Sequence, residues 1–210
     1  MHPEHEHPYT DAYSDPQPAP ADPHHFASTA PVPPHADLTT GTRFPAPVDT
    51  ALRAAGWHPG RWDIKQAEYW ADTLRAHTTP GGHLHAVFPA AVEAWAAFGG
   101  LHITPAPQPP GPGRPLAPTP LRLDPLRGLH MARTLADLGR ALGTEVCPLG
   151  EEISTGSPAP GDHQALLAID TEGRVYGLDH TGDWYLGPDI DTALTTLLTG
   201  TRPTRLTAAG

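Results

Sequence analysis

The sequence predicts an α+β fold, in which a mainly antiparallel central sheet ends in a meander and is flanked by amphipathic helices. Three observations support this prediction. Short apolar segments alternate with Gly-containing turns over residues 163–186, apolar residues recur at helical spacing in five other segments, and the first 42 residues contain too few apolar side chains to join a core. A chain of 210 residues is long enough for one domain with a tail.

The meander is predicted over residues 163–186, which read HQALLAIDTEGRVYGLDHTGDWYL. Its first strand is the apolar run 165–169, and its second is 174–178, where Val, Tyr and Leu suit a pleated surface. The segments DTEG and DHTGD supply the Asp and Gly that tight turns favour, and 184–186 forms the third strand. Because a three-strand meander with one apolar face must cover that face, we expect helices to pack on it.

Five segments carry apolar residues at helical spacing and predict the covering helices. The clearest is 88–101, with Pro at its start, a stripe of Val92, Trp95 and Phe98 for the core, and two Gly residues where it ends. The other four contain residues 48–55, 67–74, 129–142 and 188–199. Short strands are expected at 101–103, 121–124 and 146–150.

Two Pro-rich stretches are predicted to lack regular structure. Residues 1–42 hold nine Pro and six His, and we expect a disordered, acidic tail with no fixed metal site, although His5, His7, His24 and His25 could bind a metal adventitiously. Residues 104–120 hold eight Pro, which predicts a surface loop of polyproline character. The domain would then span 43–206; we expect the chain to fray over 201–210, and residues 207–210 lie outside the domain.

Charge and composition exclude several classes of function. The formal net charge is −10, and residues 1–42 contain six acids and no Lys or Arg. Such an acidic chain argues against direct binding of nucleic acid and favours a basic partner. The single cysteine, Cys147, allows no internal disulfide and suits a reducing compartment. Because no signal peptide and no long apolar run is found, we expect a cytoplasmic protein that does not span a membrane.

The sequence contains few candidates for catalytic groups. Cys147 lies in a predicted strand, where we expect a small buried apolar residue rather than a nucleophile. His83 and His85 lack a third ligand for zinc, so neither a metal nor a cofactor is predicted. Glu151 and Glu152 could form a carboxylate pair for hydrolysis, although solvated acids are the simpler interpretation.

Landmarks of one known family occur in order along the chain. They are RFP at 43–45, LRAAGW at 52–57, PGR at 59–61, FP at 88–89, FGGL at 98–101, LG at 138–139, LGT at 142–144, PLGE at 148–151 and LLAIDTEGRVY at 166–176. In this joint order the chain resembles the third subgroup of the SUKH superfamily, bacterial immunity proteins linked to polymorphic toxin systems. The resemblance covers residues 43–206, but 104–120 is Pro-rich where a hairpin is expected.

The resemblance implies a SUKH fold without a catalytic motif, in a protein that binds a cognate toxin and blocks it. Toxins associated with the superfamily are often nucleases or nucleic-acid deaminases, so the expected partner is a basic toxin domain. Predicted turns and sheet edges supply the candidate contact residues, which we expect to be exposed. These are Glu151, Glu152, Asp179, Asp183 and Trp184.

Two other functions stay open at this point. A general adaptor or regulatory scaffold of the same fold would use its Pro-rich segments to recruit partners. A hydrolase would use Glu151 or Glu152, and it would require a cleft in which one carboxyl group has a strongly raised pKa.

Overall fold

The computed structural model describes residues 42–106, 116–153 and 165–207. The chain divides into two units, Met1–Thr40 and Gly41–Gly210, and only the second contains described residues. The disorder predicted for the N-terminal tail, the centre of the Pro-rich loop at 107–115 and the fraying of 208–210 therefore lie outside the described residues. Within the described residues, no helix is both long and apolar enough to cross a membrane.

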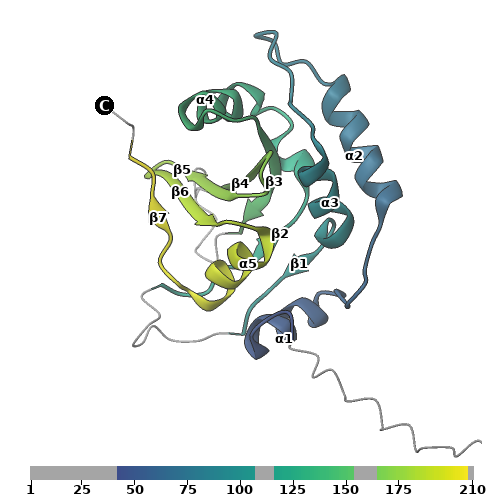
Figure 1. Cartoon of the computed structure of the whole chain (residues 1–210), viewed down its shortest axis with the longest axis vertical. Coiled ribbons are helices and arrows are strands. Elements are labelled where there is room, and N and C mark those ends of the chain that lie inside the picture. Colours follow the sequence, from purple (N-terminus) through teal and green to yellow (C-terminus); the bar gives the residue numbers. More distant parts are fainter. Residues whose placement is uncertain (1–41, 107–115, 154–164, 208–210) are drawn as a thin grey trace, which may run out of the picture. The chain divides into compact units, whose positions relative to one another are not determined.

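One antiparallel sheet of seven strands forms the centre of the second unit, and its strands are paired in the order of the sequence. Helices precede and interrupt the strands, so the predicted α+β class is confirmed (Figure 1). The strands are β1 (His102–Ile103), β2 (Leu121–Arg122), β3 (Val146–Glu152), β4 (Leu166–Asp170), β5 (Val175–Asp179), β6 (Gly182–Gly187) and β7 (Thr204–Arg205).

The predicted meander corresponds to β4, β5 and β6. Leu166 pairs with Leu178 between β4 and β5, and Tyr176 pairs with Tyr185 between β5 and β6. Gly173 closes the first turn with a φ of 84°, a value that residues with a Cβ rarely adopt. The meander is therefore where the sequence placed it, but it is the second half of a larger sheet.

Helices cover both faces of the sheet. Side chains alternate along each strand, so each strand supplies residues to the core on either face. Leu167 and Ile169 of β4 join a large core with Cys147, Val175 and the helices α1 (Ala46–Ala54), α2 (Ile64–Ala76), α3 (Pro89–Phe98) and α5 (Ile190–Thr199). Leu166 and Ala168 join a smaller core on the other face, under α4 (Ala132–Leu142). Helices therefore flank both faces of the sheet, and β4 is buried along its whole length.

The large core contains the aromatic stripe predicted for 88–101. Trp95 of α3 is buried, and its indole N–H donates to the Pro148 carbonyl on β3 at 3.2 Å. Phe98 stacks on Trp57 with ring centroids 6.1 Å apart, and Phe44 packs edge-on against Trp57 at 5.2 Å. Phe44 and Trp57, which lie before and after α1 in the chain, thus pack against Phe98 at the end of α3, while α2 packs on the outer side of α3 (Figure 1).

Two predicted boundaries need correction. The helix expected over 129–142 begins at Ala132, because residues Pro125–Gly128 form a separate 3₁₀ turn capped by Asp124. Residues 201–206 are not frayed, since Thr204 pairs with Tyr185 as part of β7. A short hairpin stem does exist around the Pro-rich loop, where Ile103 of β1 pairs with Leu121 of β2.

Candidate functional site

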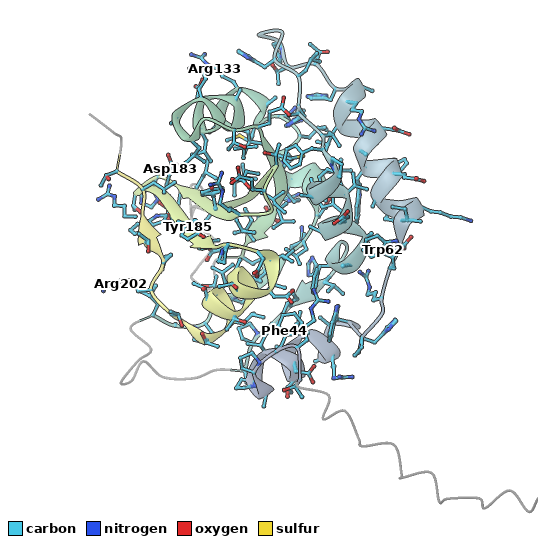
Figure 2. All side chains as sticks on the ribbon, viewed as in Figure 1. Phe44, Trp62, Arg133, Asp183, Tyr185 and Arg202 are labelled. Atoms are coloured by element: carbon cyan, nitrogen blue, oxygen red, sulfur yellow. The ribbon has the colours of Figure 1, made fainter. Side chains whose placement is uncertain are left out.

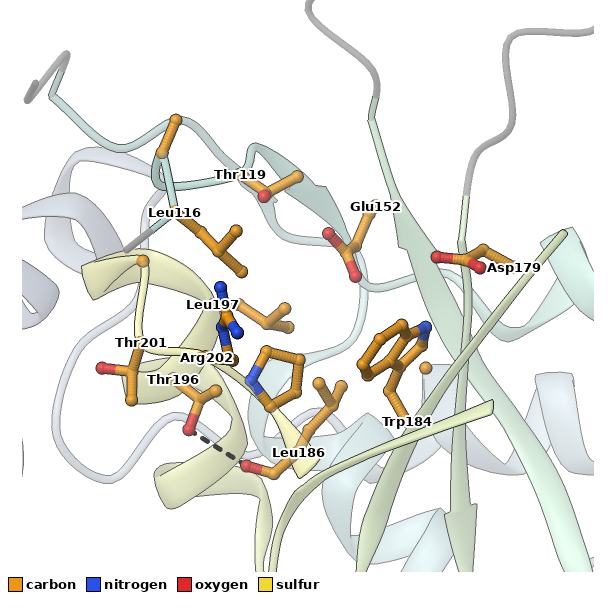
Figure 3. Close-up of a pocket in the computed structure, with 14 residues that line it drawn as sticks. Leu116, Thr119, Glu152, Asp179, Trp184, Leu186, Thr196, Leu197, Thr201 and Arg202 are labelled. Carbon is orange, nitrogen blue, oxygen red and sulfur yellow. Dashed lines mark hydrogen bonds between the residues drawn. The ribbon is translucent and has the colours of Figure 1, made fainter. Parts of the chain in front are cut away.

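A pocket of about 440 Å³ opens on the α5 face of the sheet, beyond the C-terminal end of that helix (Figure 3). One wall comes from the end of the Pro-rich loop, another from β3, β5 and β6, and the third from the last turns of α5 and the segment leading to β7. The lining residues are Leu116, Ala117, Thr119, Glu152, Gly177, Asp179, Trp184, Leu186, Thr196, Leu197, Gly200, Thr201, Arg202 and Pro203.

Three of the five predicted contact residues meet in this pocket, namely Glu152, Asp179 and Trp184. They come from β3, β5 and β6, and the register of the sheet, in which β4 lies between β3 and β5, places all three side chains on one face. Gly177 pairs with Trp184 in the register of β5 and β6. Because Gly177 has no side chain, the space beside the indole on this face of the sheet is left open. Gly177 therefore lines the pocket together with the carboxyl groups of Glu152 and Asp179 and the indole of Trp184. Figure 3 shows these three side chains at the pocket.

Glu152 is the more buried of the two acids. Burial raises the pKa of its carboxyl group and the nearby Asp179 raises it further, while a hydrogen bond from the Thr119 side chain acts in the opposite direction. No Lys or Arg among the described residues forms an ion pair with Glu152 or Asp179. Glu152 is thus a partly buried acid without a cationic partner in this part of the chain.

Asp179 ends β5 and organises the turn into β6. Its Oδ1 accepts hydrogen bonds from the Thr181 amide at 2.6 Å, the Thr181 hydroxyl at 2.6 Å and the Gly182 amide at 3.1 Å. Burial by itself would raise the pKa of Asp179, but these hydrogen bonds outweigh it and lower the pKa below its usual value. Asp179 is therefore a carboxylate at neutral pH, held in place by its turn.

Trp184 supplies the aromatic wall of the pocket. Its indole N–H is buried and makes no hydrogen bond of normal geometry, although it is close enough to Asp179 to help lower the pKa of that carboxyl group. The guanidinium carbon of Arg205, on β7, lies 5.8 Å from the centre of the Trp184 ring. The Trp184 ring thus makes a cation–π contact with Arg205 and also lines the pocket.

The other two predicted contact residues lie elsewhere. Glu151 faces away from the pocket and is only 5% exposed, so its predicted exposure is wrong. Its Oε1 is 2.8 Å from Arg127 Nε and 3.5 Å from Arg122 Nη1, which explains how the charge is accommodated. Asp183 precedes Trp184 on β6, and in Figure 2 it lies toward α4, whereas Arg202 lies on the α5 side.

The weak catalytic candidates are separated by the fold. Glu151 and Glu152 point to opposite faces of β3 and do not form a carboxylate pair. Cys147 is fully buried as predicted, and burial raises the pKa of its thiol. The His85 Nε2 atom lies 2.8 Å from the Leu129 carbonyl oxygen. Among the described residues, no group of three or more His, Cys, Asp or Glu side chains is arranged to hold a metal ion.

The opposite wall of the pocket, which contains Leu116, Thr119 and Arg202, was not predicted from the sequence. Leu116 and Thr119 belong to a stretch predicted to be a surface loop, and Arg202 belongs to a stretch predicted to fray. Two hydrogen bonds join the end of the Pro-rich loop to the end of α5. The Leu116 amide donates to the Gly200 carbonyl and the Thr119 amide donates to the Leu197 carbonyl, each at 3.2 Å. No local pattern in the sequence signals these long-range hydrogen bonds.

The sequence model of one family, described as SUKH-3 immunity protein, matches residues 44–200. This match covers every helix of the described unit and all of its strands except β7. No curated protein and no solved structure matches the chain. The family match agrees with the ordered landmarks in the sequence and with the antiparallel α+β sheet that they form. The chain therefore belongs to the SUKH-3 immunity protein family.

Proposed function

We propose that this protein binds a cognate bacterial toxin and neutralises it without catalysing a reaction, in the cytoplasm of the cell that carries both. Membership of the SUKH-3 immunity protein family carries the proposal, because an immunity protein needs a toxin as its partner. The toxin we expect is a basic domain that acts on nucleic acid. Residues that bind nucleic acid are rich in Lys and Arg, and an acidic protein can occupy them.

The acidic pocket supports this function better than it supports catalysis. Glu152 and Asp179 face the same opening beside a Trp, the type of residue that most often dominates binding energy at interfaces. Hydrolysis by two carboxyl groups would need an acid and a base poised around a substrate, but Asp179 is committed to three hydrogen bonds within its own turn. We therefore propose that Glu152, Asp179 and Trp184 contact the toxin, and that Glu151 and Asp183 lie outside the contact.

Co-expression with a toxin domain encoded beside this gene tests the proposal. We expect cells that produce the toxin alone to stop growing, and cells that also produce this protein to grow. The purified protein should form a complex with a catalytically inactive form of the same toxin, and calorimetry should give its Kd. Because the surfaces are expected to be opposite in charge, the association rate should fall as salt is raised.

An unrelated acidic protein of similar size, produced at the same level, is the control for non-specific charge effects. It should neither rescue growth nor bind the toxin. If the SUKH-3 protein gives no rescue and no complex with any toxin encoded nearby, the proposed function is wrong. Rescue without a complex would indicate that the protein acts on the toxin's substrate or product instead.

A further inference from the structure

We propose that the pocket between β5, β6 and the end of α5 receives a single arginine side chain of the toxin. This inference rests on the proposed function for the identity of the partner, and it adds the chemistry of the contact. The pocket of about 440 Å³ is within the range of concave sites that hold small ligands. A long side chain from a partner can enter the pocket while the surfaces of the two proteins around it come into contact.

The walls of the pocket match the two parts of an arginine side chain. Leu116, Leu186 and Leu197 offer apolar surface for the three methylene groups. Glu152, Asp179 and Trp184 offer carboxyl groups and an aromatic ring for the guanidinium (Figure 3). An arginine whose guanidinium lies toward Trp184 would therefore place its methylene groups against the leucines and its charge beside the two carboxyl groups.

The charge of the pocket calls for a cation. Two carboxyl groups line it, and neither is paired with a described Lys or Arg. The pKa of the Glu152 carboxyl group is raised because burial and Asp179 both disfavour its charge. A guanidinium beside Glu152 would remove that penalty, so binding and ionisation of Glu152 would favour each other.

Arginine fits better than lysine because of Trp184. A guanidinium is planar, stacks on aromatic rings and can donate to two carboxylates at once, whereas an ammonium is a compact and strongly hydrated charge. The chain shows the preferred contact itself, since Arg205 places its guanidinium 5.8 Å from the Trp184 ring. The toxin arginine would use the part of the indole that lines the pocket.

Arg202 allows a test of whether the bound group is positive or negative, because Arg202 also lines the pocket and carries positive charge. If the pocket receives a cation, Arg202 opposes binding and its removal does not weaken the complex. If the pocket receives an anion, Arg202 attracts it while Glu152 repels it. The two occupants therefore predict opposite effects for substitutions at residues 152 and 202.

The experiment compares the affinity of the full chain and its variants for the catalytically inactive toxin. Glu152→Gln keeps the shape and an oxygen that can accept from Thr119, and we expect it to weaken binding by about 30-fold or more. Trp184→Leu should weaken binding by about 30-fold. Asp183→Asn is the matched control: it removes one acid from the same sheet on the other face, and Kd should change by less than about threefold. Arg202→Gln should leave binding equal or tighter.

A small probe tests the pocket without the toxin. Nα-acetyl-arginine amide at about 10 mM should shift the NMR signal of the Trp184 indole N–H, which a Trp184→Phe variant assigns. The matched citrulline compound has nearly the same shape and no charge, and it should not shift the signal. The Glu152→Gln protein should lose the response to the arginine compound. No shift, or equal shifts for both compounds, would overturn the arginine pocket.

The outcomes separate the two proposals. If the wild-type chain does not bind the toxin, the proposed function fails. If it binds the toxin, but Glu152→Gln and Asp183→Asn behave alike, only the arginine pocket fails. Weaker binding by Arg202→Gln, with tighter binding by Glu152→Gln, would show that the pocket takes an anion. An Arg→Ala scan of the toxin should find one arginine whose loss has no further effect on the Glu152→Gln variant.

Discussion

Asp170, at the end of β4, shows how a single residue holds the meander together. The side chain is fully buried and accepts from the Glu172 amide at 3.0 Å, the Arg174 amide at 2.9 Å, Arg174 Nε at 2.6 Å and the Tyr176 hydroxyl at 2.9 Å. A buried carboxylate is stable only with such a complete set of donors. The DTEGRVY sequence is therefore explained by a structural turn.

The first prediction concerns this turn. Asp170→Asn should lower the free energy of unfolding by about 3 kcal/mol, because the substitution removes the charge that pairs with Arg174 and turns an NH₂ group toward donors. Urea unfolding monitored by circular dichroism measures the change. Glu172→Gln in the same turn is the control. The Glu172 side chain is 64% exposed and forms an ion pair with Arg174 Nη2, so we expect its replacement to lower the free energy of unfolding by about 0.5 kcal/mol. Equal losses for both variants would contradict this account.

The second prediction concerns His85, which is buried near His77 and His130. Burial lowers the pKa of its imidazole and the two neighbouring histidines lower it further, while the hydrogen bond to the Leu129 carbonyl oxygen acts in the opposite direction. Since the unfolded chain then binds a proton more readily than the folded one, His85 should cost stability as the pH falls below about 6.5. Above that pH its effect should be absent.

His85→Gln tests this sign, because the Gln amide can replace the Nε2 contact with Leu129 and does not titrate. We expect the stability of the variant, measured by urea unfolding at several pH values, to fall less than that of the wild type between about pH 7 and 5. His58→Gln, at an exposed position, is the control and should follow the wild-type curve. Identical curves for the wild type and His85→Gln would show that His85 does not contribute to the acid response.

At the scale of elements, α4 and α5 end in the same way. Gly143 and Gly200 are their C-caps, each with a φ of 70°. The surroundings differ: a Cβ on Gly143 would have no neighbour within 4 Å, whereas a Cβ on Gly200 would lie 2.1 Å from the Leu116 carbonyl oxygen. The second glycine is therefore required both by its backbone conformation and by the close approach of the Pro-rich loop.

The third prediction follows from this pair. Gly143→Ala should lower stability by about 1 kcal/mol, which is the cost of a left-handed conformation for a residue with a Cβ. Gly200→Ala should lower stability by roughly 1–3 kcal/mol more, because the loop must also move. Thermal unfolding of both variants under one condition measures the difference. Equal losses would mean that the contact between Leu116 and Gly200 does not constrain the loop.

At the scale of the whole molecule, charge is distributed unevenly. Residues 1–40 contain six of the 23 acids and no Lys or Arg, and the proposed contact residues all lie in the unit Gly41–Gly210. Long-range attraction to a basic partner depends on total charge, whereas the lifetime of the complex depends on local contacts. The tail should therefore affect how fast the toxin binds more than how long it stays bound.

The fourth prediction is that removing residues 1–40 slows association with the toxin by a few-fold at low salt and leaves the dissociation rate unchanged. Surface plasmon resonance at low and high salt measures both rates, and the urea midpoint checks that Gly41–Gly210 stays folded. Replacing the six tail acids with their amides is the control, since it keeps the length and should have the same effect. Loss of all binding on truncation would instead support an adaptor that recruits partners through its tail.

The sequence by itself determined the local elements and the family. Short apolar segments separated by turns that contain Asp and Gly define the meander, and helical spacing with Pro at the start and Gly at the end defines the helix at Pro89–Phe98. These features depend on residues close in the chain, so they can be found without coordinates. The same holds for Cys147, whose apolar neighbours in a strand indicated burial.

Only the tertiary structure decided which acids face the pocket. The register of β3 against β4 shifts between Pro148 and Gly150, so Glu151 pairs with Leu166 on the α4 face and Glu152 turns toward the pocket. Without this bulge the two side chains would exchange faces, because a shift of one residue reverses every side chain of a strand. Gly150 permits the close approach, since a Cβ there would lie 2.2 Å from the Arg122 carbonyl oxygen. Such a contact joins residues far apart in the chain, and no local pattern in the sequence encodes it.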